Sequence, residues 1–129
     1  MKKLYVEGLP SYHEMDEMVF KYVLYEDNEL LEAKTVYHDY RKPALTGLYA
    51  VILLMKEFPK LKNQEVEIIM NEGALLEQIK GTSTTRNRDI LKVADLCRRQ
   101  MSKFGGKLKL VSVSGNHEGK VEWESRLDV

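Results

Sequence analysis

Apolar and polar residues alternate through much of the first third of the chain, a pattern typical of half-buried β-strands. Residues 3–7 alternate and stop at a turn signal over residues 8–11. Residues 18–25 are rich in Val, Phe and Tyr, and residues 30–37 resume the extended pattern after a polar turn. The pattern predicts an antiparallel meander of three strands.

Further along, the apolar positions fall at helical spacing or in short continuous runs. Pro43 suits a first helical turn and Pro59 ends the first predicted helix. The hydroxyl residues 82–85 are candidate N-caps for a long helix that Gly105-Gly106 closes, and residues 114–119 indicate a loop. After the meander we predict helix, strand, two helices, strand and helix at residues 44–58, 65–70, 74–79, 90–104, 107–113 and 120–127. The predicted order is βββαβααβα.

Four local strings, in this order, resemble segments of the ribonuclease H-like family. They are LYVEGLPSY at 4–12, PALTGLYAVILLM at 43–55, VEIIMNEGALLEQIKG at 66–81 and WESRLDV at 123–129. In the family these segments are a first strand ending in Asp-Gly, a helix with an early Glu, a fourth strand ending in Asp-Ser and a closing Ala-Asp-x-Leu helix. The resemblance implies an α/β fold with a five-stranded mixed sheet and helices on both faces. It implies one such domain over residues 1–129.

Active members of this family hold two magnesium ions with four carboxylates and hydrolyse a phosphodiester between them. The resemblance places Glu7, Thr46, Asn71 and Ser125 at those four positions, so one carboxylate remains. The neutral oxygens of Thr, Asn and Ser do not balance two hard divalent cations. We therefore expect a pseudoenzyme that needs no cofactor.

An alternative is a displaced magnesium site that retains ribonuclease activity on an RNA/DNA hybrid. Glu72 adjoins Asn71 in the sequence, and Glu122 and Asp128 each lie three residues from Ser125. His117 lies in the predicted loop before the last helix, where active ribonucleases H carry a histidine that helps product release or proton transfer. The other interpretation of His117 is a solvated loop residue.

The formal charge is zero, but the charges are unevenly distributed. Residues 1–39 carry a net charge of −5, whereas residues 80–109 carry +7. Clustered cations bind nucleic-acid phosphates without needing a precise spacing. The candidate nucleic-acid-binding residues are Arg86, Arg88, Lys92, Arg98, Arg99 and Lys103. We expect weak binding of RNA, DNA or their hybrid. The alternatives are an ordinary solvated helix face, with Asp89 and Asp95 as ion-pair partners, and a structural or oligomeric module without nucleic-acid affinity.

Composition excludes several other classes of function. The single Cys97 forms no internal disulfide, and no cysteine and histidine cluster has zinc-ligand spacing. No apolar run approaches the roughly 20 residues that span a bilayer, and residues 1–3 lead directly into a predicted strand. We expect a cytoplasmic protein without membrane contact. Tyr22, Tyr25 and Tyr37 are more typical of residues that cover a sheet than of residues that stack on bases.

Overall fold

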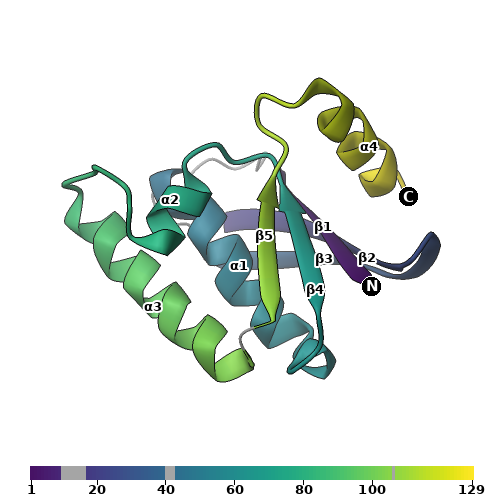
Figure 1. The fold of residues 1–129 in the computed structure, drawn as a ribbon, viewed down its shortest axis with the longest axis horizontal. Coiled ribbons are helices and arrows are strands. Elements are labelled where there is room, and N and C mark those ends of the chain that lie inside the picture. Colours follow the sequence, from purple (N-terminus) through teal and green to yellow (C-terminus); the bar gives the residue numbers. More distant parts are fainter. Residues whose placement is uncertain (10–16, 40–42, 106) are drawn as a thin grey trace.

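A computed structural model describes residues 1–9, 17–39, 43–105 and 107–129. Its strands form one sheet in the order β3-β2-β1-β4-β5 (Figure 1). The strands are β1 (Lys2–Leu9), β2 (Glu17–Glu26), β3 (Glu29–Asp39), β4 (Val66–Met70) and β5 (Leu108–Ser112). The α-helices are α1 (Thr46–Glu57), α2 (Leu75–Lys80), α3 (Arg88–Phe104) and α4 (His117–Leu127), with short 3-10 helices at Pro43–Leu45 and Pro59–Leu61. The predicted order of strands and α-helices is confirmed.

The sheet is mixed, as predicted. β1 pairs antiparallel with β2, and β2 with β3, so the first strands form the expected meander. β4 pairs in parallel with both β1 and β5. Parallel neighbours need crossover connections, and the helices supply them. Part of the predicted turn at residues 8–11 lies outside the described residues.

Each face of the sheet has its own apolar cluster because side chains along a strand alternate between faces. The larger cluster joins Leu4 and Val6 of β1 to α1, α2 and α3. The smaller one joins Tyr5 to Trp123 and Leu127 of α4. Helices therefore cover both faces, as the sequence predicted, and α4 alone among the described helices packs on its side (Figure 1).

The tyrosines of the meander take different positions. Tyr22 is fully buried in the larger cluster, and its hydroxyl donates a hydrogen bond to the Ala50 carbonyl oxygen at 2.7 Å. Burial raises the pKa of Tyr22 above its usual range. Tyr25 is buried in the smaller cluster, so sheet coverage is confirmed for both residues. Tyr37 on the edge strand β3 is instead 64% exposed.

Two helix starts differ from the prediction. The N-cap of α3 is Asn87, whose side chain accepts hydrogen bonds from the backbone N–H groups of Asp89 and Ile90. The hydroxyl residues 82–85 precede this cap. The last helix begins at His117, because the Asn116 side chain accepts a hydrogen bond from the backbone of Gly119. His117 thus lies in a first helical turn, and its prediction as a loop residue is wrong.

The end of α3 follows the prediction. Gly105 has a φ of 121°, and a Cβ at this position would lie 2.3 Å from Asn63 Oδ1. Only glycine fits both the backbone conformation and the close approach. Gly106, the second residue of the predicted stop, lies outside the described residues. No helix in the described part of the chain is long and apolar enough to cross a membrane.

Candidate functional site

Strands β1 and β4 run parallel as neighbours, β1 continues past the last paired position, and the chain leaves the two strands in opposite directions. β1 leads into β2 on one side, whereas β4 leads through α2 and α3 to β5 on the other. In open α/β sheets, ligands bind at the carboxyl ends of strands where the connections diverge in this way. The register pairs Tyr5 with Ile69. Glu7 lies two residues beyond the last paired position of β1, and Asn71 two residues beyond that of β4.

The N-terminus of α1 packs against this same end of the sheet. A Cβ built on Gly8 would lie 3.5 Å from the Thr46 methyl carbon, and one built on Gly47 would lie 3.4 Å from Glu72 Cγ. These approaches place Thr46 next to β1 and bring Glu72 against α1. Of the positions that the resemblance selected, Thr46 lies beside Gly8 of β1, Glu7 precedes Gly8, and Asn71 directly follows β4.

Glu72 also lies at this end of the sheet, on the face that α1 covers. It lines a hollow of about 210 Å³ together with Gly47, Ala74 and Gln78. Burial raises the pKa of the Glu72 carboxyl above its ordinary value. Glu7 instead lies on the α4 side, two residues beyond Tyr5 along β1. The two carboxylates thus belong to opposite faces of the sheet.

A cation lies next to Glu7. The β1–β2 register pairs Glu7 with Lys21, so their side chains are cross-strand neighbours on one face. The Lys21 ammonium also donates to the Val129 carbonyl oxygen at 3.3 Å. A lysine in this position opposes the binding of a divalent cation by Glu7.

Helix α4 carries the remaining candidates, Ser125, Glu122 and Asp128. Trp123 donates its indole N–H to the Val6 carbonyl oxygen at 3.0 Å and fixes the helix on β1. Ser125, two residues further along, is exposed and lies on the opposite helix face from Trp123. Glu122 accepts a hydrogen bond from the Tyr5 hydroxyl at 3.4 Å, and Asp128 is exposed at the C-cap.

The donor set at this end does not fit two magnesium ions. Among the described residues there is no group of three or more Asp, Glu, His and Cys side chains that could hold a metal. Glu7 offers one carboxylate, Asn71 an amide and Thr46 a hydroxyl, with Lys21 beside them. Magnesium at a hydrolytic centre needs charge-balancing carboxylates.

The six basic candidates, on α3 and just before it, divide into two groups. Arg98 donates to the carbonyl oxygens of Gln78 and Ile79 at 3.0 and 3.1 Å and so caps the end of α2. Arg98 and Arg99 both pair with Asp95, at 3.7 and 3.1 Å. The ion pairs with Asp95 agree with the alternative that the sequence left open, whereas the capping of α2 by Arg98 was not predicted.

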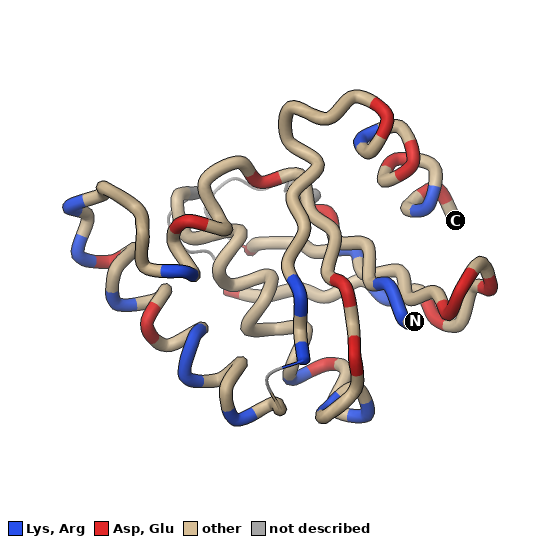
Figure 2. Tube along the Cα trace, viewed as in Figure 1, with Lys and Arg blue, Asp and Glu red and all other residues tan. Residues whose placement is uncertain are grey.

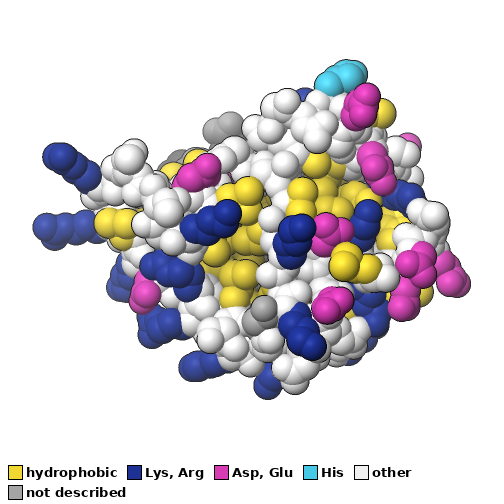
Figure 3. Space-filling model, viewed as in Figure 1, with side chains coloured by type: hydrophobic (Ala, Val, Ile, Leu, Met, Phe, Trp, Pro, Cys, Tyr) yellow, Lys and Arg dark blue, Asp and Glu magenta, His cyan; other side chains and the backbone are white. Residues whose placement is uncertain are grey.

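The other four candidates, which we name the basic surface, are Arg86, Arg88, Lys92 and Lys103. All four are exposed, and no ion pair or side-chain hydrogen bond joins them to the described residues. Lys and Arg positions follow α3 along its length (Figure 2), and cationic side chains project from this side of the molecule (Figure 3). The N-terminal end of α3, with its partial positive charge, adds to the field near Arg86 and Arg88.

No protein-family model matches the sequence, and no curated protein matches it. Solved structures do match. LC11-RNase H1 in complex with an RNA/DNA hybrid aligns with a TM-score of 0.72 and 13% identity over 92% of this chain and 88% of that chain. RNase H1 from Halobacterium salinarum gives 0.71 and 12% over 92% and 89%. The N-terminal RNase H domain of rv2228c from Mycobacterium tuberculosis gives 0.63 and 15% over 98% and 93%.

The chain has the ribonuclease H-like fold. The alignments cover nearly the whole described chain, so the fold expected from the four strings is confirmed. At this level of identity the ribonuclease H-like likeness concerns the backbone, and function must be argued from the site.

Proposed function

We propose that this chain is a ribonuclease H-like module that binds nucleic acid and does not hydrolyse it. The basic surface on α3 carries the proposal, because its four cations are exposed and have no ion-pair partner among the described residues. Cations that are free of internal partners are available to replace the counterions of a phosphate backbone. The likeness to a ribonuclease H1 solved with an RNA/DNA hybrid makes a hybrid the first ligand to test.

The chemistry at the ends of β1 and β4 supports the proposed absence of turnover. Two-metal hydrolysis needs carboxylates that converge on both ions. Glu7 has Lys21 as its cross-strand neighbour, and Glu72 lies on the other side of the sheet against α1. Binding and cleavage are therefore separable in this chain, and magnesium has no part in the proposed function.

The test measures hybrid binding by fluorescence anisotropy across a salt series. We expect replacement of Arg86, Arg88 and Lys92 by Gln to lower affinity and to reduce the slope of log affinity against log salt by about 2 to 3. Duplex DNA and single-stranded RNA are expected to lose affinity by similar factors, because backbone contacts carry little sequence information.

A matched control removes the same charge elsewhere. Lys56, Lys62 and Lys120 are exposed on other elements, and their replacement by Gln changes the net charge equally. We expect this control to keep the parental salt slope. A parent protein without affinity at low salt would refute nucleic-acid binding and favour a structural module. Equal losses in both triple variants would refute the basic surface as the binding site.

The same preparations test the absence of hydrolysis. We expect the RNA strand of the hybrid to stay intact with magnesium present. Cleavage that disappears in both Glu7→Gln and Glu72→Gln would contradict this expectation and establish a displaced catalytic site.

A further inference from the structure

Within the described ranges of the chain, no strand lies beside the outer edge of β5. β5 is last in the strand order and pairs only with β4. None of its five residues is buried, whereas four of the five residues of β4 are. We propose that this edge is the docking site for an extended segment of a partner protein in which acidic and apolar residues alternate.

The backbone of β5 offers regularly spaced hydrogen-bonding groups at this edge. The Lys107 carbonyl accepts from the Val66 N–H at 3.3 Å, and the Val113 N–H donates to the Met70 carbonyl at 2.8 Å. The odd-numbered residues of this segment thus direct their backbone groups toward β4. Because these directions alternate along a strand, the N–H and C=O groups of Leu108, Leu110 and Ser112 face the open edge. An added peptide strand has matching groups at the same spacing.

On the face of the sheet that α1, α2 and α3 cover, this edge is apolar. Leu108 and Leu110 are only partly buried and pack against the larger cluster. Leu110 also lies beside Leu75 and Leu76 of α2. Figure 3 shows apolar side chains exposed along the strip between β5 and the α2 and α3 side. Every second residue of a strand added to β5 would lie over this strip and remove apolar surface from water.

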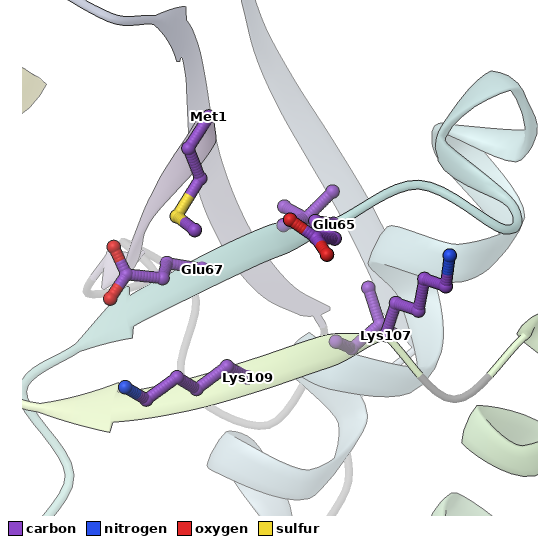
Figure 4. Close-up of a pocket in the computed structure, with 7 residues that line it drawn as sticks. Met1, Glu65, Glu67, Lys107 and Lys109 are labelled. Carbon is purple, nitrogen blue, oxygen red and sulfur yellow. The ribbon is translucent and has the colours of Figure 1, made fainter.

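On the opposite face of the sheet, where α4 packs, this edge carries lysines. Lys109 of β5 and Lys107, which directly precedes the strand, line a hollow of about 340 Å³ together with Glu65 and Glu67 (Figure 4). Glu67 is the register neighbour of Lys109, yet no ion pair joins them. An added strand would lie next to the lysines and about 4.8 Å further from the glutamates. Acidic side chains at its outward positions would therefore be attracted by cross-strand lysines.

Charge also favours an acidic peptide over two other candidate occupants of this edge, a second copy of the chain and nucleic acid. Two β5 strands paired antiparallel over their full length would place Lys109 opposite Val111, so a second copy offers the lysines no acidic partner. A phosphate backbone on this face would meet Glu65 and Glu67, whereas the basic surface on α3 offers cations without such neighbours.

The test uses a fluorescein-labelled peptide of about eight residues that alternates glutamate with valine and leucine. We expect it to bind the native protein and to slow hydrogen exchange at the Leu108 and Leu110 amides. The same peptide with N-methyl groups on the backbone amides that would point toward β5 lacks those hydrogen-bond donors, and we expect it not to bind. This control leaves the protein unchanged.

Protein variants then test the charge pattern. We expect Lys107→Glu with Lys109→Glu to weaken binding of the acidic peptide by about fivefold or more and to favour a peptide with lysine in place of glutamate. The variant with Gln at Arg86, Arg88 and Lys92 carries fewer positive charges on α3 but keeps the β5 edge, so we expect it to bind the peptide as the parent does.

Several results would overturn the proposal. They are no peptide binding at millimolar concentration, binding that is insensitive to N-methylation, and a peptide affinity that depends on the α3 cations. Self-association lost on Lys109→Glu, or RNA that protects the β5 amides better than the peptide does, would assign the edge to another occupant. These outcomes leave the test of hybrid binding unaffected, because that test depends on α3.

Discussion

Trp123 is the residue on which the position of α4 depends most directly. It is 8% exposed, and its indole N–H donates to the Val6 carbonyl oxygen at 3.0 Å. The pairing between β1 and β4 ends at Tyr5 and Ile69, so this bond lies one residue past the last paired position of β1. Loss of the indole would remove both an apolar contact and the partner of a buried backbone group.

Two substitutions separate these contributions. Trp123→Phe keeps most of the apolar contact and removes the donor, so we expect it to lower the free energy of unfolding by about 1–3 kcal/mol. Trp123→Ala also removes the ring, and we expect a loss of about 3–5 kcal/mol. Val121 on the same helix is 52% exposed, and we expect Val121→Ala to change stability by less than about 0.5 kcal/mol.

Urea denaturation followed by far-ultraviolet circular dichroism measures all three variants. Tryptophan fluorescence is unsuitable, because Trp123 is the only tryptophan in the chain. If Trp123→Ala behaved like Val121→Ala, α4 would not be held on the sheet in the way described. If Trp123→Phe matched the parent while Trp123→Ala did not, the ring would matter and the hydrogen bond would not.

Three further predictions concern other parts of the fold. Because Arg98 caps α2 whereas Arg99 makes an exposed ion pair, we expect Arg98→Gln to cost about 1–2 kcal/mol in urea denaturation and Arg99→Gln less than about 0.5. Burial raises the pKa of Glu72 in the folded chain, so its ionisation opposes folding as the pH rises through and above the unfolded pKa. We therefore expect the difference in unfolding free energy between Glu72→Gln and the parent to shift in favour of Glu72→Gln from pH 4 to pH 7. An equal difference at both pH values would contradict this. Burial raises the pKa of the Cys97 thiol to about 12, so we expect iodoacetamide to react with it only as the protein unfolds, and fast modification of native protein would show that the site is open.

The order of the elements was predictable because local periodicity carries it. The alternation of residues 18–25 and the apolar spacing of residues 90–104 each reflect one face of one element. The helix starts were less predictable, since several polar residues compete for each cap. Ser83 and Thr85 accept hydrogen bonds from backbone N–H groups within their own turn, and Asn87 makes the cap.

Gly119 is the reason that the sequence predicted too late a start for α4. Glycine is a poor helix former, so its presence favoured a loop. In the structure a Cβ at Gly119 would lie 3.1 Å from the Asn116 side chain and 3.2 Å from Val113. The small residue lets the capping asparagine fold over the first turn. That requirement comes from packing and is invisible to propensity.

The candidate site was predictable only where a resemblance supplied the positions. Nothing in the local sequence indicates that Glu7 has Lys21 as its neighbour, because this follows from the strand register. The contact between Tyr5 and Glu122 likewise joins residues at opposite ends of the chain. Similarly, the structural role of Arg98 depends on where α2 ends. Long-range contacts of this kind decide which charged residues remain free to bind a ligand.

The stability of this fold does not depend on carboxylates at the ends of β1 and β4. The larger cluster and the docking of α4 through Trp123 hold the sheet from both faces, and neither uses the side chains of Asn71 or Ser125. Clustered carboxylates repel one another unless cations neutralise them. Neutral residues in their place remove that repulsion. The remaining carboxylate, Glu7, has the positive charge of Lys21 as its cross-strand neighbour. The ribonuclease H-like architecture is therefore compatible with neutral residues at these positions, and the exposed surfaces on α3 and at the β5 edge are the ones that we propose as binding sites.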